Sequence, residues 1–207
     1  MIEQGSEEWF NQRLGKVTAS RIKDVMATIK SGESASVRNY RAQLVAERLT
    51  GTIQESYTNS AMQWGIDNEP LARALYEIRT GMDVEQTGFI DHPHINMTGA
   101  SPDGFAGDGL VEIKCPSTAT HIDYLTSGVP PSEYKYQMLW QMECTGKKWC
   151  DFVSYDPRMP EELSLFVVRY EIDNEELDRI RQVVIKFLDG VDEMLSNLNK
   201  LKDSRHG

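Results

Sequence analysis

The sequence predicts an α/β protein in which a central mixed sheet is flanked by helices. Helical patterns and short β-branched runs follow one another in the order helix, helix, strand hairpin, helix, strand, strand, helix, which is typical of such folds. A long C-terminal helix is predicted because apolar residues recur at spacings of three and four over residues 174–201. We expect one domain over residues 1–207, with residues 174–207 as a C-terminal helical extension.

Helices are expected throughout the first 50 residues. Ser6 is a suitable N-cap, and the acidic residues that follow it, Glu7 and Glu8, complement a helix dipole. The expected helices cover residues 6–14, 18–26 and 37–49, the second beginning at Thr18 or Ser20.

Residues 58–80 have a longer helical pattern that contains Gly65 and Pro70. Pro is tolerated in a first helical turn but disrupts a helix interior. We therefore expect a break near Pro70, with Asn68 or Glu69 capping the helix that follows.

Strands and helices alternate in the rest of the chain. β-branched and aromatic residues favour strands, and Ser117 is placed to cap a helix. Strands are predicted over residues 82–85, 88–91, 149–155 and 165–172, and helices over residues 117–127 and 130–145.

The most informative stretch is residues 101–116, which predicts a β-hairpin. It opens with the turn sequence Pro-Asp-Gly, continues into an apolar run at residues 110–115, and ends at a Pro that cannot extend a ladder. Side chains alternate along a strand, so Glu112 and Lys114 share one face. Asp103 can reach the same point from across the hairpin.

Two carboxylates and an amine at one point suit metal-assisted hydrolysis of a phosphodiester. Hard divalent cations such as Mg²⁺ bind carboxylate oxygens and keep several waters. A bound ion polarises the phosphoryl oxygen, and a neighbouring Lys can orient water or stabilise developing charge. The alternative is an exposed cross-strand Glu–Lys pair beside an ordinary turn. The turn, the apolar strand and the closing Pro favour the metal site.

Asp103 with Glu112-Ile113-Lys114 resembles the signature of the PD-(D/E)XK nucleases, which have a restriction-endonuclease-like core. Further motifs resemble one branch of that superfamily, the phage λ-exonuclease (YqaJ-type viral recombinase) family of alkaline 5′-to-3′ double-strand exonucleases. The resemblance spans residues 9–170. Its motifs are Trp9…Arg13-Leu14-Gly15…Thr18-Ala19-Ser20, the turn at residues 101–104, and Tyr134…Gln137.

The resemblance implies a metal site. Asp103, Glu112 and the Ile113 carbonyl would hold Mg²⁺, with Mn²⁺ as an expected substitute. Glu69 would be a further acid that helps at a second ion, and Lys114 would orient or activate water.

The resemblance also implies a site for a terminal 5′-phosphate, formed by Arg13, Ser20, Ser101 and Gln137. Arg13 offers a planar fork that matches phosphate. Ser20 lies near an expected helix start, where backbone amides favour anions. Simpler roles stay open: Arg13 lying along a helix surface, Ser20 or Glu69 capping a helix, and Gln137 facing solvent.

Composition restricts the class of protein further. The chain of 207 residues is 40% hydrophobic and 26% charged, as is ordinary for a globular protein. It has no run of 18 apolar residues and no apolar signal-peptide core, so we expect neither a membrane span nor export. Three cysteines are too few for a four-cysteine metal site and fit a reducing cytosol.

The net charge of −10 is unevenly distributed. Residues 1–50 contain eight Lys or Arg and six Asp or Glu, a net of +2, so the remainder carries −12. A basic surface on an acidic body fits a protein that binds phosphate in one groove. An acidic domain with scattered basic residues fits the charge equally well.

From the resemblance we expect a Mg²⁺-dependent, processive 5′-to-3′ exonuclease that acts on ends of linear double-stranded DNA and leaves 3′ overhangs for phage-type recombination. No ATPase phosphate-binding loop is present, so processivity would require topological capture of the DNA, for which the resemblance implies a ring-shaped homotrimer. A single-strand annealing protein would be its partner, in the cytoplasm of a bacterial host of a phage or prophage. The alternatives are a site-specific or repair endonuclease of the same superfamily and a non-catalytic DNA-binding subunit.

Overall fold

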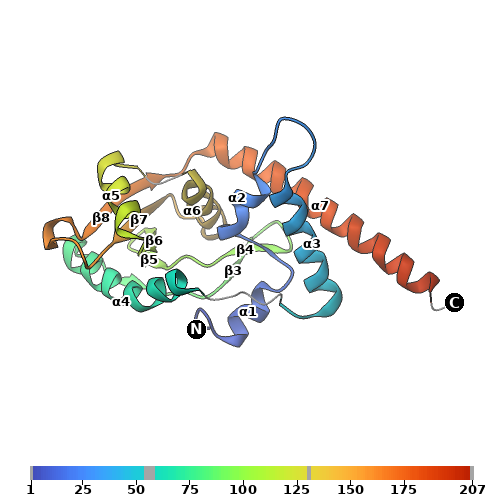
Figure 1. The fold of residues 1–207 in the computed structure, drawn as a ribbon, viewed down its shortest axis with the longest axis horizontal. Coiled ribbons are helices and arrows are strands. Elements are labelled where there is room, and N and C mark those ends of the chain that lie inside the picture. Colours follow the sequence, from blue (N-terminus) through green and yellow to red (C-terminus); the bar gives the residue numbers. More distant parts are fainter. Residues whose placement is uncertain (1, 54–58, 130–131, 206–207) are drawn as a thin grey trace.

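The structure is a computed structural model that describes residues 2–53, 59–129 and 132–205. Two sheets organise it (Figure 1). The strands are β1 (Val17–Thr18), β2 (Val84–Glu85), β3 (Ile90–Asp91), β4 (Thr98–Ala100), β5 (Gly104–Ala106), β6 (Gly109–Lys114), β7 (Trp149–Tyr155) and β8 (Leu165–Glu171).

The larger sheet has the strand order β2-β5-β6-β7-β8, and the smaller has the order β1-β4-β3. In the larger sheet β6 and β7 run parallel, and the other neighbours are antiparallel. The predicted central mixed sheet is thus confirmed. The smaller sheet was not expected from the sequence.

Helices and short 3₁₀ turns surround the sheets. They are α1 (Glu7–Arg13), η1 (Ala19–Arg21), α2 (Ile22–Val25), α3 (Ala35–Thr50), α4 (Ser60–Thr80), α5 (Thr118–Ser127), α6 (Ser132–Thr145), η2 (Glu161–Leu163) and α7 (Asn174–Ser204). No helix in the described ranges is both long and apolar enough to cross a membrane.

The two faces of the larger sheet pack against different helices. On one face, Val111 and Ile113 of β6 pack with Ala72 and Tyr76 of α4. On the other face, Leu110 belongs to the main core with residues of α2, α3, α6 and α7. The side chains of β6 therefore alternate as predicted, which directs Glu112 and Lys114 toward α6.

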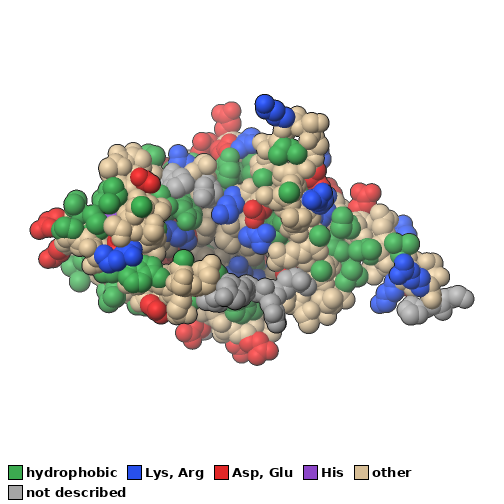
Figure 2. Space-filling model, viewed as in Figure 1, with side chains coloured by type: hydrophobic (Ala, Val, Ile, Leu, Met, Phe, Trp, Pro, Cys, Tyr) green, Lys and Arg blue, Asp and Glu red, His purple; other side chains and the backbone are tan. Residues whose placement is uncertain are grey.

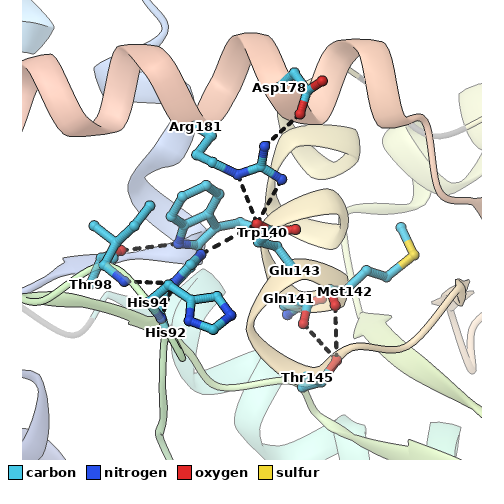
Figure 3. A network of polar contacts seen from close by, with 11 residues as sticks. His92, His94, Thr98, Trp140, Gln141, Met142, Glu143, Thr145, Asp178 and Arg181 are labelled. Carbon is cyan, nitrogen blue, oxygen red and sulfur yellow. Dashed lines mark hydrogen bonds and ion pairs between the residues drawn. The ribbon is translucent and has the colours of Figure 1, made fainter.

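A polar network fixes α6 to its neighbours (Figure 3). Arg181 of α7 donates to Glu143 of α6, with its nitrogens 2.9 and 2.8 Å from Oε1. Trp140 of α6 donates its indole N–H to Oγ1 of Thr98 in β4, at 3.0 Å. The Trp140 ring also packs on His92, with ring centroids 5.1 Å apart. Contacts from both α7 and the small sheet thus hold α6 in place.

Thr18, one of the two predicted caps, is the N-cap of η1, but its side chain makes no capping hydrogen bond and the predicted helix is divided into η1 and α2. Val17 and Thr18 form β1, which pairs in parallel with β4, and the short turns η1 and α2 follow. The Thr98 hydroxyl donates to the carbonyl of Val17 at 2.8 Å. Pairing with a distant strand has overridden the local capping signal.

The predicted break near Pro70 is also wrong. α4 is continuous through Pro70, and its N-cap is Asn59, whose side chain accepts a hydrogen bond from the backbone N–H of Met62 at 2.9 Å. Pro70 lies on the exposed side of the helix, where water can replace the lost backbone hydrogen bond. Glu69 is therefore inside the helix and does not cap it.

Candidate active site

The register of the β5–β6 hairpin brings the two predicted acids together. Gly104 pairs with Val111, and one further step of the antiparallel register places Asp103 opposite Glu112. Oδ2 of Asp103 accepts a hydrogen bond from the backbone N–H of Ile113 at 2.6 Å. The carboxylates thus meet at the open end of the hairpin.

Glu112 is fully buried and its carboxylate is surrounded by donors. Lys114 and Gln137 donate to Oε1, with Gln137 Nε2 at 2.6 Å. Gln141 Nε2 donates to Oε2, also at 2.6 Å. Both oxygens of this buried carboxylate are therefore paired with donors from β6 and α6.

Lys114 is held as a cation. Burial alone would lower its pKa, but the adjacent carboxylates of Glu112 and Asp103 outweigh burial and raise it. Its ammonium also lies 5.4 Å from the centroid of the Tyr134 ring. Lys114 is therefore a positively charged hydrogen-bond donor in this site.

Asp103 lies where negative charge is in excess. Burial and the nearby charge of Glu112 raise its pKa well above the usual range, and Lys114 only partly opposes them. A divalent cation would relieve this repulsion, so the acids present fit a metal ion. No group of three or more His, Cys, Asp or Glu in the described ranges is arranged as a metal cluster. Carboxylate and carbonyl oxygens are the ligands that hard divalent cations prefer, so Asp103, Glu112 and the Ile113 carbonyl are suitable candidates.

Glu69 approaches the site from α4. Its carboxylate pairs with Arg73 one turn along the helix, at 2.7 Å. It is close enough for its charge to raise the pKa of Asp103 further. The structure thus places Glu69 beside the acids, and its role as a ligand stays a prediction.

Trp9 connects two of the residues predicted to bind phosphate, Arg13 and Ser101. The guanidinium of Arg13 lies over the Trp9 ring, 3.8 Å from its centroid. The Trp9 indole N–H donates to Oγ of Ser101 at 3.0 Å. These contacts join α1 to the chain two residues before Asp103. Trp9 belongs to the sequence motif but is not among the predicted site residues.

Arg13 makes no ion pair with any carboxylate in the part of the chain that the structure describes. Burial lowers its pKa to about 10, so it remains cationic at neutral pH. A partly buried cation that stacks on an aromatic ring and makes no ion pair is well suited to phosphate, although the charge of Glu47 acts on it.

Ser20 is exposed in η1, and its hydroxyl lies 3.3 Å from that of Thr18. Among the described residues no contact joins Ser20 to Arg13 or to the carboxylates. Its place in a phosphate site stays a prediction.

Gln141 is the main feature that the sequence reasoning missed. It follows Gln137 by four residues, so both lie on one face of α6. That spacing is the signal that could have identified it.

The fold and the convergence of Asp103, Glu112 and Lys114 define a protein of the PD-(D/E)XK superfamily. The family model of the YqaJ-like viral recombinase domain matches residues 8–148. The chain belongs to this family.

Solved structures agree with the assignment. The crystal structure of an alkaline exonuclease, LHK-Exo, from Laribacter hongkongensis is 48% identical, with a TM-score of 0.89. LHK-Exo in complex with dAMP is 49% identical, with a TM-score of 0.91. Each match covers 98% of this chain and 100% of the other.

A phage related exonuclease from Haemophilus somnus 129PT shares the fold, with a TM-score of 0.73 at 17% identity. That match covers 88% of this chain and 96% of the other. A search of curated protein sequences found no match.

Proposed function

We propose that this protein is a Mg²⁺-dependent exonuclease that digests one strand of linear double-stranded DNA from its 5′ end and leaves a 3′ overhang. The observation that carries the proposal is the convergence of the buried Glu112 and the half-buried Asp103 with a cationic Lys114, beside the Arg13–Trp9–Ser101 group. The high identity with an alkaline exonuclease supports it.

The residues of the chain have separate tasks in this mechanism. When bound, Mg²⁺ polarises the phosphodiester and makes a water molecule more acidic. Asp103, Glu112 and the Ile113 carbonyl would hold it, with Glu69 helping at a second ion and Mn²⁺ as a substitute. Lys114 keeps its proton on Nζ and donates it in a hydrogen bond to the attacking water or to the charge developing on phosphate.

In this proposal, the residues that bind the terminal 5′-phosphate determine the direction of cleavage. Arg13 would bind the terminal 5′-phosphate with its planar fork, helped by Ser101, Ser20 and Gln137. The surface supports a phosphate-binding role. Figure 2 shows Lys and Arg side chains around the middle of one face and Asp and Glu side chains mainly toward its edge. Backbone phosphates would be attracted to that middle region.

We further propose that processivity comes from a ring-shaped homotrimer that encloses the DNA. The protein would supply single strands to an annealing protein during phage-type recombination in a bacterial cytoplasm. Membership of the viral recombinase family supports this part of the proposal.

An end-labelled linear duplex tests the proposal. We expect digestion with Mg²⁺, none after chelation, faster loss of the strand with a 5′-phosphate than with a 5′-hydroxyl, and no cutting of closed circles. Cleavage of circles would favour the endonuclease alternative, and binding without cleavage would favour a non-catalytic subunit. Equal rates on the two ends would contradict the assignment of Arg13.

A further inference from the structure

Gln141 is fully buried on α6, and its two amide atoms have different surroundings. Nε2 donates to Oε2 of Glu112 at 2.6 Å. Oε1 is buried and has no hydrogen-bond partner among the described residues. An unsatisfied buried carbonyl oxygen costs free energy. A Met of similar size would fill the same space without that cost.

The amide of Gln141 has one workable orientation. Turning it over would place Oε1 against the carboxylate of Glu112, so the N–H must face the acid. The unsatisfied oxygen is thus a consequence of the hydrogen bond to Glu112.

The three donors around Glu112 differ in their exposure. Lys114 and Gln137 share Oε1 and are partly exposed, so substrate or water can reach them. Gln141 alone among these three is fully buried, and it holds Oε2.

The helix around Gln141 is rigidly placed. The residue before it, Trp140, is tied to Thr98, and Arg181 is bound to Glu143 two residues after it (Figure 3). An amide on such a helix can fix the plane of a carboxylate.

We propose that Gln141 is a positioning residue for the metal site: its hydrogen bond to Oε2 fixes the plane of the Glu112 carboxylate that would face the bound divalent cation. The proposal rests on the proposed function, since it concerns the same cation. It adds a residue outside the motifs that identify the site.

Gln141→Met tests the proposal through Mn²⁺ binding, measured by calorimetry on the DNA-free protein. We expect the dissociation constant for Mn²⁺ to rise about tenfold or more, as for other groups that orient metal ligands. The melting temperature of the metal-free protein should change by only a few degrees, because removal of the unsatisfied Gln141 oxygen offsets the loss of one donor to Glu112. Gln141→Asn, which keeps an amide but is one methylene too short, should show the same loss of affinity.

A matched control is Gln43→Met. Gln43 lies on α3 and donates to Glu47 at 2.8 Å, four residues along its helix. The Gln43→Met substitution should leave the affinity for Mn²⁺ unchanged.

A lower melting temperature for Gln141→Met with wild-type Mn²⁺ affinity would overturn the proposal, because Gln141 would then be purely structural. A wild-type protein that binds no divalent cation would overturn it too. Weaker Mn²⁺ binding in the variant of a protein that cleaves no DNA would leave the proposal standing and remove the proposed function.

Discussion

At the scale of single residues, charge determines what Lys114 contributes. The two carboxylates beside it raise its pKa despite burial, which favours its protonated form. In the proposed mechanism it would contribute an N–H donor and a positive charge where negative charge develops.

Lys114→Met keeps most of the volume and removes both contributions. Because loss of one such donor typically lowers turnover about 100-fold or more, we expect that decrease in single-turnover digestion of a linear duplex. DNA binding, measured by fluorescence anisotropy with Ca²⁺ in place of Mg²⁺, should change little. The exposed Lys148 gives the matched control Lys148→Met. Normal digestion by Lys114→Met would contradict the mechanism.

Arg13 is expected to set the preference for a 5′-phosphate. Arg13→Gln removes the charge but can still pack on Trp9, so the ratio of rates on 5′-phosphate and 5′-hydroxyl ends should fall by about tenfold, as for loss of one charge-assisted contact. Arg13→Lys keeps a charge without the fork and should give an intermediate ratio. Arg205→Gln, at the far end of α7, is the control. A ratio unchanged in both Arg13 variants would exclude this role.

At the scale of elements, a turn after β7 joins the two walls of the site. Arg158 pairs with the buried Asp156 at 2.7 Å and donates to the carbonyl of Pro116 at 3.2 Å, just beyond β6. Its guanidinium also lies over Trp64 of α4, 4.4 Å from the ring centroid. The turn thus sets the position of the helix that carries Glu69 relative to the strand that carries Lys114.

Asp156→Asn should destabilise this turn in a pH-dependent way. Burial of Asp156 acts against ionisation, but hydrogen bonds from Arg158 and Thr118 win and lower its pKa to about 2. A carboxyl with a depressed pKa in the folded state stabilises the fold above the unfolded pKa and loses that contribution as pH falls toward 2. We expect the free energy of unfolding at pH 7 to be about 1–2 kcal/mol higher for the wild-type protein than for Asp156→Asn.

Urea unfolding of both proteins between pH 3 and pH 7 measures this difference, which should narrow steadily below about pH 4. A constant difference across that range would show that the charge of Asp156 does not matter. Asp108→Asn in the exposed hairpin turn is the control.

Elements that obey local rules could be predicted from the sequence. Ser6 and Ser117 cap their helices as expected, and alternation along β6 placed Glu112 and Lys114 on one face. The errors at Thr18 and Pro70 have a different origin. β1 exists because it pairs with β4, about 80 residues away, and an exposed Pro is tolerated inside a helix that is well packed on its other side.

The candidate site could be predicted only in part for the same reason. Asp103 and Glu112 lie on one hairpin, so their proximity follows from local register. The donors to Glu112 come from α6, and the link from Arg13 to Ser101 passes through Trp9, 92 residues from Ser101. Such contacts depend on packing that no local pattern encodes.

At the scale of the whole molecule, α7 has two different parts. Its first half belongs to the main core, through residues such as Ile180, Val184 and Phe187. Its second half extends beyond the rest of the molecule toward the C-terminus (Figure 1). Leu198 and Leu201 are 38% and 54% exposed there, one turn apart on one side of the helix. We expect these two leucines to contribute to a subunit interface, since contiguous exposed apolar surface marks interaction sites.

If this stripe is where subunits of the proposed homotrimer meet, Leu198→Glu with Leu201→Glu should convert trimers to monomers in light scattering. The length of DNA digested per binding event should shorten severalfold, because an open subunit cannot enclose the duplex, whereas removal of the first nucleotide should be retained. Ser196→Glu with Asn199→Glu adds the same charge to exposed polar positions and should leave a trimer. A double Leu variant that stays trimeric would place the interface elsewhere, and a monomeric wild type that still digests long tracts would show that enclosure of the DNA is not the source of processivity.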